Sequence, residues 1–286
     1  MSICITGAAG KLGSLVCSYL LERVHPSNII ACAREPEQAV ALAGQGIEVR
    51  HADYDQPETL NAAFAGVSKL IFISSSHRDD TVRLRQHAHV VEAAKQAGVK
   101  HILYTGFAFP GDGTTPPHPL HLATERAIAA TGLPYTFLRN ALYLDFLASF
   151  DLEGAVVSGE WTTAPGEWTF NAVSRNDLAQ AIAAVAAEPG PRHLHRTYEL
   201  TANRAWTFQD AADALSRLAG KPVLHRESAE ARHWLYGYLQ KIDVRSTSPD
   251  LAAILGRPLS SLEDGMAPLL EHVRFIQERS RPSRKT

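Results

Sequence analysis

The sequence predicts an α/β fold in which a doubly wound parallel sheet is covered by helices on both faces. Two observations lead to this prediction. Short, continuously apolar segments recur through the first half of the 286-residue chain, and amphipathic segments separate them. Buried parallel strands that alternate with covering helices produce this pattern. The second half lacks the alternation and predicts a smaller α/β lobe at the carboxyl ends of the strands.

The expected elements of the first half follow one another from the start of the chain. The first predicted strand begins at residue 2 or 3, and further strands are predicted at 28–33, 48–53, 69–74, 101–105 and 135–139. The predicted helices lie at 12–20, 37–43, 55–66, 80–97 and 120–131. Asp55 is expected to cap the third helix because an acid, Glu58, follows three residues later. Gly98 is expected to end the fourth helix.

The second half is expected to divide between the sheet and a separate lobe. Residues 154–166 are rich in Gly, Pro, Thr and Trp, which predicts loops and short strands. An Ala-rich helix is expected within 171–187, a strand at 197–201 and a further helix that ends near Gly220. The predicted division is a Rossmann-type dinucleotide-binding domain at 1–150 with 171–202 returning to it. A substrate-binding lobe at 151–170 and 203–277 and a flexible tail at 278–286 complete the chain.

A glycine-rich turn after the first strand is the strongest indication of a ligand. Gly7, Gly10 and Gly13 follow the apolar run Ile3-Cys4-Ile5 and precede a helical pattern. The spacing G-x-x-G-x-x-G is typical of the short-chain dehydrogenase type of dinucleotide-binding protein. Such a turn lets the backbone approach a pyrophosphate, and the helix N-terminus presents free N–H groups to that anion. A tight turn without a ligand is the alternative interpretation.

Arg34 indicates which nicotinamide cofactor this turn would hold. The residue at the end of the second strand contacts the adenosine ribose, as an acid for NAD or a cation for the 2′-phosphate of NADP. A guanidinium can bind that phosphate through two hydrogen bonds. NADPH (NADP) is therefore the expected cofactor. An ordinary solvated arginine, next to Glu35, is the alternative interpretation.

The composition argues against several other classes of protein. The formal net charge is −2 and the pI is about 6.7, so neither nucleic acid nor a membrane surface is an expected partner. No apolar run approaches the roughly 20 residues of a membrane span, and the early first strand leaves no room for a signal peptide. Cys4, Cys17 and Cys32 fall in predicted core elements, as thiols of a cytoplasmic protein would. No metal site is expected, and the oligomeric state stays open, with a homodimer as one option.

Seven blocks of the chain carry a family pattern. They are residues 6–13, 48–54, 70–74, 97–102, 104–108, 121–125 and 134–143. Together they resemble the NmrA-like branch of the atypical short-chain dehydrogenases, including its members that reduce triphenylmethane dyes and quinones. The last two blocks are the most similar to the dye-reducing members. The resemblance extends to about Gly220, and this chain is shorter than those relatives just before 246–256.

This resemblance implies a role for each matching position. The cofactor-binding residues would be Thr6, Gly7, Gly10, Lys11, Leu12 and Gly13 at the pyrophosphate, Arg34 at the 2′-phosphate, Asp53 and Tyr54 at the adenine, Ser74, Ser75 and Ser76 at the ribose, and Thr105, Gly106, Phe107 and Asn140 at the nicotinamide. Residues 140–143 would close over the nicotinamide. The alternatives are a turn-forming role for Asp53, an ordinary polar loop for the three serines and a core position for Tyr143.

The chain lacks the Tyr and Lys, four residues apart, that protonate the carbonyl oxygen in many short-chain dehydrogenases. None of its eight tyrosines is followed by Lys at that spacing. The resemblance implies His121, on the helix that faces the nicotinamide, as the one conventional acid. Tyr143 is the second catalytic candidate. A merely structural histidine is the alternative interpretation of His121.

The missing Tyr–Lys pair favours an acceptor that needs no proton from the enzyme. Hydride addition to a cationic triphenylmethane dye yields a neutral product, and a quinone yields a weakly basic anion that water can protonate. The expected function is therefore an NADPH-dependent oxidoreductase that transfers hydride to a small quinone-like or dye-like aromatic substrate. A non-catalytic NAD(P)-binding redox sensor of the NmrA type is the alternative. The aromatic residues in or near the segments expected to form the pocket are Phe107, Phe109, Tyr143, Phe146, Trp161, Trp168, Trp206 and Phe208. About half of them are expected to be core residues instead.

Overall fold

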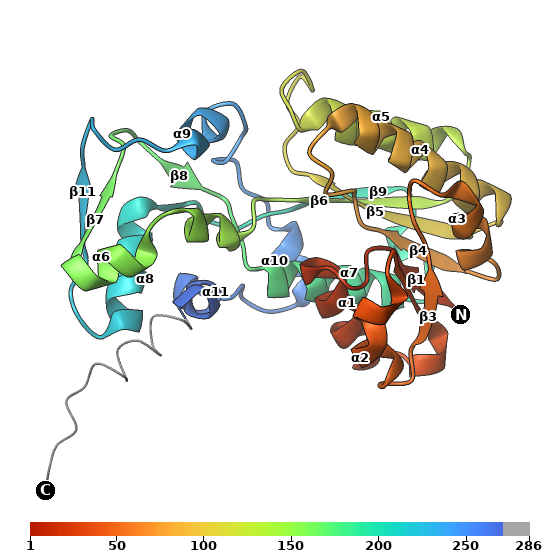
Figure 1. Cartoon of the computed structure of the whole chain (residues 1–286). Coiled ribbons are helices and arrows are strands. Elements are labelled where there is room, and N and C mark those ends of the chain that lie inside the picture. Colours follow the sequence, from red (N-terminus) through yellow and green to blue (C-terminus); the bar gives the residue numbers. More distant parts are fainter. Residues whose placement is uncertain (271–286) are drawn as a thin grey trace, which may run out of the picture.

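A seven-stranded sheet forms the middle layer of one lobe of the computed structural model, which describes residues 1–270 (Figure 1). All neighbouring strands of this sheet are parallel. In spatial order the strands are β3 (Glu48–His51), β2 (Ile29–Ala33), β1 (Ile3–Ile5), β4 (Lys69–Phe72), β5 (His101–Phe107), β6 (Tyr135–Asn140) and β9 (Arg196–Leu200). The order reverses between β1 and β4, which confirms the predicted doubly wound α/β fold.

Helices cover both faces of the sheet and enclose two apolar cores (Figure 1). One face carries α1 (Lys11–Leu21), α2 (Val40–Ala43), α7 (Arg175–Ala187) and α10 (Asp250–Leu255), and the other carries α3 (Pro57–Ala63), α4 (Asp80–Gln96) and α5 (His118–Ala130). Ile3 and Ile5 of β1 enter the first core and Cys4 enters the second. Neighbouring residues of a strand point to opposite faces, so both faces need apolar side chains.

Burial follows the position of each strand in the sheet. Every residue of β1, β2 and β4 is buried, whereas the edge strand β3 keeps Glu48 and His51 exposed. Lys69 is the one charged residue of β4. Its Nζ donates to the backbone carbonyls of Ala186, at 2.9 Å, and of Glu188 at the end of α7. This buried ammonium group thus has acceptors.

The remaining elements gather at the carboxyl ends of the strands in a second lobe (Figure 1). They are α6 (Leu152–Ser158), β7 (Glu160–Thr163), β8 (Thr169–Phe170), β10 (Trp206–Thr207), α8 (Phe208–Ala219), β11 (Leu224–Glu227), α9 (Trp234–Leu239) and α11 (Leu262–Met266). The strands form two small sheets, β7 with β11 and β8 with β10. The Phe208 ring centroid lies 4.8 Å from that of Phe170 and 5.6 Å from that of Trp161. Trp161, Trp206 and Phe208 are buried in this core, as expected for part of the aromatic set.

Most predicted helices and strands are confirmed with shifted ends, but two local predictions are wrong. Asp55 does not cap α3, because its carboxylate accepts hydrogen bonds from Arg85 Nη2 at 2.7 Å and Gln86 Nε2 at 2.8 Å. The segment predicted as loops from residue 154 contains the helix α6. The Asp151 side chain caps that helix by accepting from the N–H of Gly154 at 2.8 Å.

Further expectations concern the last strand of the sheet, the three thiols and the end of the chain. The strand expected at 197–201 is β9, which pairs with β6. Cys4, Cys17 and Cys32 are buried free thiols. No helix within residues 1–270 is long and apolar enough to cross a membrane. The tail expected at 278–286, and residues 271–277 of the expected lobe, lie outside the described residues.

Candidate active site

A cleft of about 1100 Å³ opens at the carboxyl edge of the sheet, beside the reversal of strand order between β1 and β4. Ligands of open α/β sheets bind at such reversals. The lining comes from the segments that follow β1, β2, β3 and β4, together with Gln86 of α4, Tyr143 and Arg175. Among the predicted site residues, the cleft brings together Gly7, Gly10, Lys11, Leu12, Gly13, Arg34, Asp53, Tyr54, Ser74, Ser75, Ser76 and Tyr143.

The glycine-rich turn forms the wall of the cleft where β1 passes into α1. Gly7 has a φ of 62°, and the N–H of Gly10 donates to the Gly7 carbonyl at 3.0 Å. A Cβ on Gly13 would lie 2.2 Å from the Gly7 carbonyl oxygen, so only glycine lets α1 start this close to the turn. Gly10 caps α1 without a side-chain acceptor, and the first turn contains no acid. The first amides of α1 therefore remain open to an anionic ligand.

Tyr54 and Thr6 fix the turn to the neighbouring strands. The Tyr54 hydroxyl lies 2.5 Å from Thr6 Oγ1 and donates to the Ile73 carbonyl at 2.8 Å. Thr6 Oγ1 also accepts from the N–H of Ile73 at 3.0 Å. Burial raises the pKa of Tyr54 well above its ordinary value. Thr6 is buried behind the cleft and supports its floor, and Tyr54 lines it.

Asp53 lines the cleft and also forms a turn. Its carboxylate accepts from the N–H of Asp55 at 2.9 Å and from Gln56 Nε2 at 3.1 Å. Asp53 therefore forms the expected turn, and its role toward a ligand stays a prediction.

Arg34 lies at the rim of the cleft, directly after β2. Its side chain is 72% exposed, and its Nε is 3.8 Å from Glu35 Oε1. The Glu35 carboxylate has a closer partner, because Gln38 Nε2 donates to it at 2.5 Å. An exposed ion pair of this kind contributes little free energy, so the guanidinium remains available to a phosphate.

The serines after β4 are held by groups of β5 and α4. The N–H of Ser74 donates to Thr105 Oγ1 at 3.0 Å, and the N–H of Ser75 donates to His87 Nε2 at 2.9 Å. Burial, with the positive charge of Arg83 as the second cause, lowers the pKa of His87 to about 3. The neutral imidazole can therefore accept this bond. Thr105 thus positions the serine loop from outside the lining.

Tyr143 and Arg175 close the other end of the cleft. The guanidinium carbon of Arg175 lies 4.6 Å from the centroid of the Tyr143 ring. Arg175 Nη1 donates to Asp145 Oδ2 at 2.5 Å. Its Nε is buried and has no hydrogen-bond partner among residues 1–270. Asn140 Nδ2 donates to the Tyr143 hydroxyl at 3.4 Å. Tyr143 is therefore a wall of the cleft, held by a cation and an amide.

His121 lies outside the lining of this cleft, on α5. Its side chain is almost fully buried, and its Nδ1 is 2.8 Å from the Tyr104 hydroxyl. Burial lowers the pKa of His121 to about 3, with the positive charge of Arg83 as the next cause. Its ring stacks on Phe107 at a centroid distance of 6.4 Å. Gly106, Phe107 and Asn140 end β5 and β6 and are also absent from the lining, so their contact with a cofactor stays a prediction.

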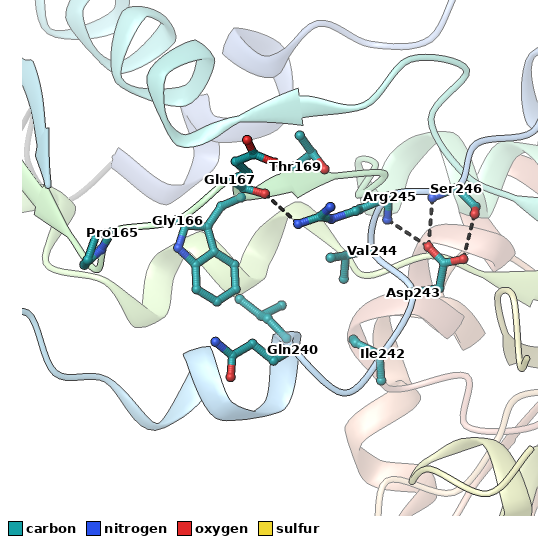
Figure 2. Close-up of a pocket in the computed structure, with 12 residues that line it drawn as sticks. Pro165, Gly166, Glu167, Thr169, Gln240, Ile242, Asp243, Val244, Arg245 and Ser246 are labelled. Carbon is teal, nitrogen blue, oxygen red and sulfur yellow. Dashed lines mark hydrogen bonds between the residues drawn. The ribbon is translucent and has the colours of Figure 1, made fainter. Parts of the chain in front are cut away.

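A second cavity, of about 570 Å³, lies in the second lobe between residues 165–169 and 239–246 (Figure 2). Trp168 stands on one wall, and Gln240 and Ile242 stand on the other. Arg245 Nη2 joins the walls by donating to the Glu167 carbonyl at 2.9 Å, as Figure 2 shows. The cavity is thus bounded by an indole and a mixture of polar and apolar groups.

Sequence reasoning missed several residues of the large cleft. His77 and Arg78 directly follow the three predicted serines, so extending that loop would have found them. No local pattern in the sequence indicated that Gln86 and Arg175 would line the cleft. Arg175 reaches the cleft because α7 packs on α1, a contact between distant parts of the chain.

The fold and the cleft define a Rossmann-type dinucleotide-binding protein. A model of the NmrA-like family matches residues 1–231, and the chain belongs to this family. Quinone oxidoreductase 2 of Escherichia coli is 40% identical over 230 residues, which cover 80% of this chain and 78% of that protein.

Two solved structures are similar over nearly the whole chain. Citrobacter sp. triphenylmethane reductase complexed with NADP(H) has a TM-score of 0.86 at 44% identity, covering 94% of this chain and 100% of that one. The NADPH-dependent quinone oxidoreductase of Escherichia coli complexed with NADPH has a TM-score of 0.82 at 34% identity, with the same coverage. These relatives are oxidoreductases, and their structures contain the cofactor type that Arg34 predicts here.

Proposed function

We propose that this protein is an NADPH-dependent reductase that transfers hydride to a quinone or to a triphenylmethane-dye-like aromatic acceptor. One observation supports the proposal most: the cleft joins the glycine-rich turn, the open N-terminus of α1 and the exposed guanidinium of Arg34. These are the groups that a pyrophosphate and a 2′-phosphate require. The similarity to a quinone oxidoreductase and a triphenylmethane reductase supports the acceptor class.

The residues of the cleft fit this cofactor. Gly10 has no side chain at the point where the backbone would meet the pyrophosphate, and the first turn of α1 contains no carboxylate to repel it. Arg34 would bind the 2′-phosphate, and Tyr143 with Arg175 would bound the opposite end. When bound, NADPH supplies the hydride that reduces the acceptor.

The side chains of this protein bind and orient the cofactor and the acceptor, and they do not protonate the acceptor. With a pKa lowered to about 3, His121 is neutral near pH 7 and holds no spare proton for a general acid role. A ketone would need such a proton, whereas a cationic dye needs none and a quinone anion takes one from water. This state of His121 favours the proposed acceptors over ketones. We assign the acceptor to the carboxyl ends of β5 and β6, where Phe107 packs against the second-lobe core.

A direct assay tests the proposal. Purified protein is mixed with NADPH and either menadione or malachite green, and the absorbance of NADPH and of the dye is followed. Oxidation of NADPH that depends on both protein and acceptor is the expected result. Arg34→Ala protein serves as a control, since it should reduce the rate at limiting NADPH. Tight NADPH binding without oxidation by any aromatic acceptor would contradict the proposal and support the redox-sensor alternative.

A further inference from the structure

Tyr104 and His121 form a buried pair between β5 and α5. The Tyr104 side chain is fully buried, and its hydroxyl is 2.8 Å from His121 Nδ1. Burial raises the pKa of Tyr104 well above its ordinary value, so the phenol keeps its proton. A buried hydroxyl that donates to no acceptor is costly. The geometry therefore favours donation from Tyr104 to the Nδ1 lone pair of His121.

The neighbouring hydroxyl of Thr124 is already engaged. Thr124 Oγ1 donates to the Leu120 carbonyl at 2.9 Å. His87 Nε2 accepts from the N–H of Ser75, so His87 Nδ1 bears the proton and donates to Thr124 Oγ1 at 2.8 Å. His121 Nδ1, at 2.8 Å, is the acceptor within hydrogen-bond distance of the Tyr104 hydroxyl. Because His121 is neutral, its single proton then resides on Nε2.

The Nε2 atom of His121 lies on the side of the imidazole away from Tyr104. This nitrogen has no hydrogen-bond partner among the described residues, yet it is not among the polar atoms that are fully enclosed. Tyr104 belongs to the core beneath the sheet, whereas Phe107, which stacks on the same imidazole, packs against the second-lobe core. His121 therefore lies where the two parts of the molecule meet, at the carboxyl end of β5.

We propose that Tyr104 is a positioning residue that holds His121 as the Nε2–H tautomer, and that this N–H binds the acceptor oxygen on which negative charge develops. The proposal rests on the proposed reductase function and assigns quinones, rather than cationic dyes, as the acceptor class served by this pair. Hydride from the reduced cofactor carries two electrons to the quinone, which becomes a hydroquinone anion. A proton from water then completes the hydroquinone. A fixed N–H donor stabilises the anionic oxygen without giving up its proton.

A cationic dye needs no hydrogen-bond donor of this kind. Hydride adds to its central carbon and neutralises a positive charge, so no oxyanion forms and the N–H of His121 gives no advantage. The two acceptors therefore separate an oriented donor from a residue that merely shapes the pocket. A role in shape alone would affect both acceptors alike.

Tyr104→Phe removes the hydroxyl and keeps the ring. We expect kcat with menadione to fall about tenfold, the size of one hydrogen bond, with KM within about twofold. Activity with malachite green should stay within about twofold. Tyr198→Phe is the matched control, because the Tyr198 hydroxyl lies 2.9 Å from His193 Nδ1 in the same kind of pair beside β9. That variant should change neither activity. Equal losses with quinone and dye in Tyr104→Phe would overturn the proposal.

The tautomer can be measured without turnover. In ¹⁵N-labelled protein near pH 7, the imidazole shifts of His121, assigned with a His121→Gln variant, should place the proton on Nε2. They should move toward a mixture of tautomers in Tyr104→Phe. A proton on Nδ1 in the unmodified protein would overturn the proposal. If the unmodified protein reduces no acceptor, the proposed function is wrong, and these shifts still decide whether Tyr104 sets the tautomer.

Discussion

Substitution of two glycines of the first turn should affect different properties, NADPH binding at Gly10 and folding stability at Gly13. Gly10 has an extended backbone, with φ −77° and ψ 166°, which valine adopts readily. A Cβ there would lie 3.2 Å from the Gly7 carbonyl oxygen, so the turn must yield by only a few tenths of an ångström. A Cβ on Gly13 would lie 2.2 Å from that oxygen and 2.8 Å from the Cα of Ala8. Both of these neighbours are backbone atoms, which cannot rotate away.

These distances set the size of the expected effects. Gly10→Val should cost about 1 kcal/mol of folding free energy, chiefly as the loss of a glycine N-cap. Gly13→Ala forces backbone apart and should cost about 3 kcal/mol or more. At about 2–4 °C per kcal/mol, the melting temperature should fall by a few degrees in the first variant and by about 6–12 °C in the second. Gly10→Val should nevertheless lose NADPH binding by at least about a hundredfold, because its side chain fills the space for the pyrophosphate.

Calorimetry and fluorescence titration with NADPH test both parts. The expected pattern is a folded Gly10→Val protein that does not bind NADPH and a destabilised Gly13→Ala protein. Unchanged NADPH affinity in folded Gly10→Val would refute the assignment of the cleft. A Gly13→Ala protein as stable as the original would refute the packing argument.

Other predictions concern two arginines of the cleft and two buried histidines. Arg34→Ala should weaken NADPH by about 1.5–3 kcal/mol and NADH little, measured as kcat/KM for the two cofactors, whereas equal losses would point to a role in adenine contact or folding. Arg175→Gln should raise the Kd for NADPH several-fold by releasing Tyr143, with Arg175→Lys closer to the original protein, and an unchanged Kd in Arg175→Gln would contradict this. The pKa values of His87 and His121 are lowered to about 3, from about 6.5 in an unfolded chain. The unfolded state therefore binds more protons between these values, and stability should fall as the pH drops below about 6.5. Urea unfolding at pH 7 and pH 5 should show that the free energy of unfolding falls by about 2 kcal/mol for each histidine. The variant His87→Gln should show a smaller fall. A fall that His87→Gln leaves unchanged would contradict the assignment.

The sequence predicted those parts of the site that depend on local chain geometry. The glycine-rich turn and Arg34 are placed by the ends of β1 and β2, and a strand end is a local feature that apolar runs reveal. Asp55 shows where local reasoning stops. Its capping pattern was sound, but Arg85 and Gln86 on α4 are better partners for its carboxylate than the free amides of α3. A tertiary contact of this kind leaves no mark within a few residues of Asp55.

The chemistry of His121 depends on such tertiary contacts even more. As a residue type, histidine near a nicotinamide suggests a general acid, because its ordinary pKa lies near neutral pH. The fold buries this ring between Tyr104 and Phe107 and near the charge of Arg83, which together keep it neutral. It is thereby changed from a proton source into an N–H donor. Tyr104, 17 residues earlier on β5, determines which nitrogen that donor is, and only the packing of α5 on β5 brings the two together.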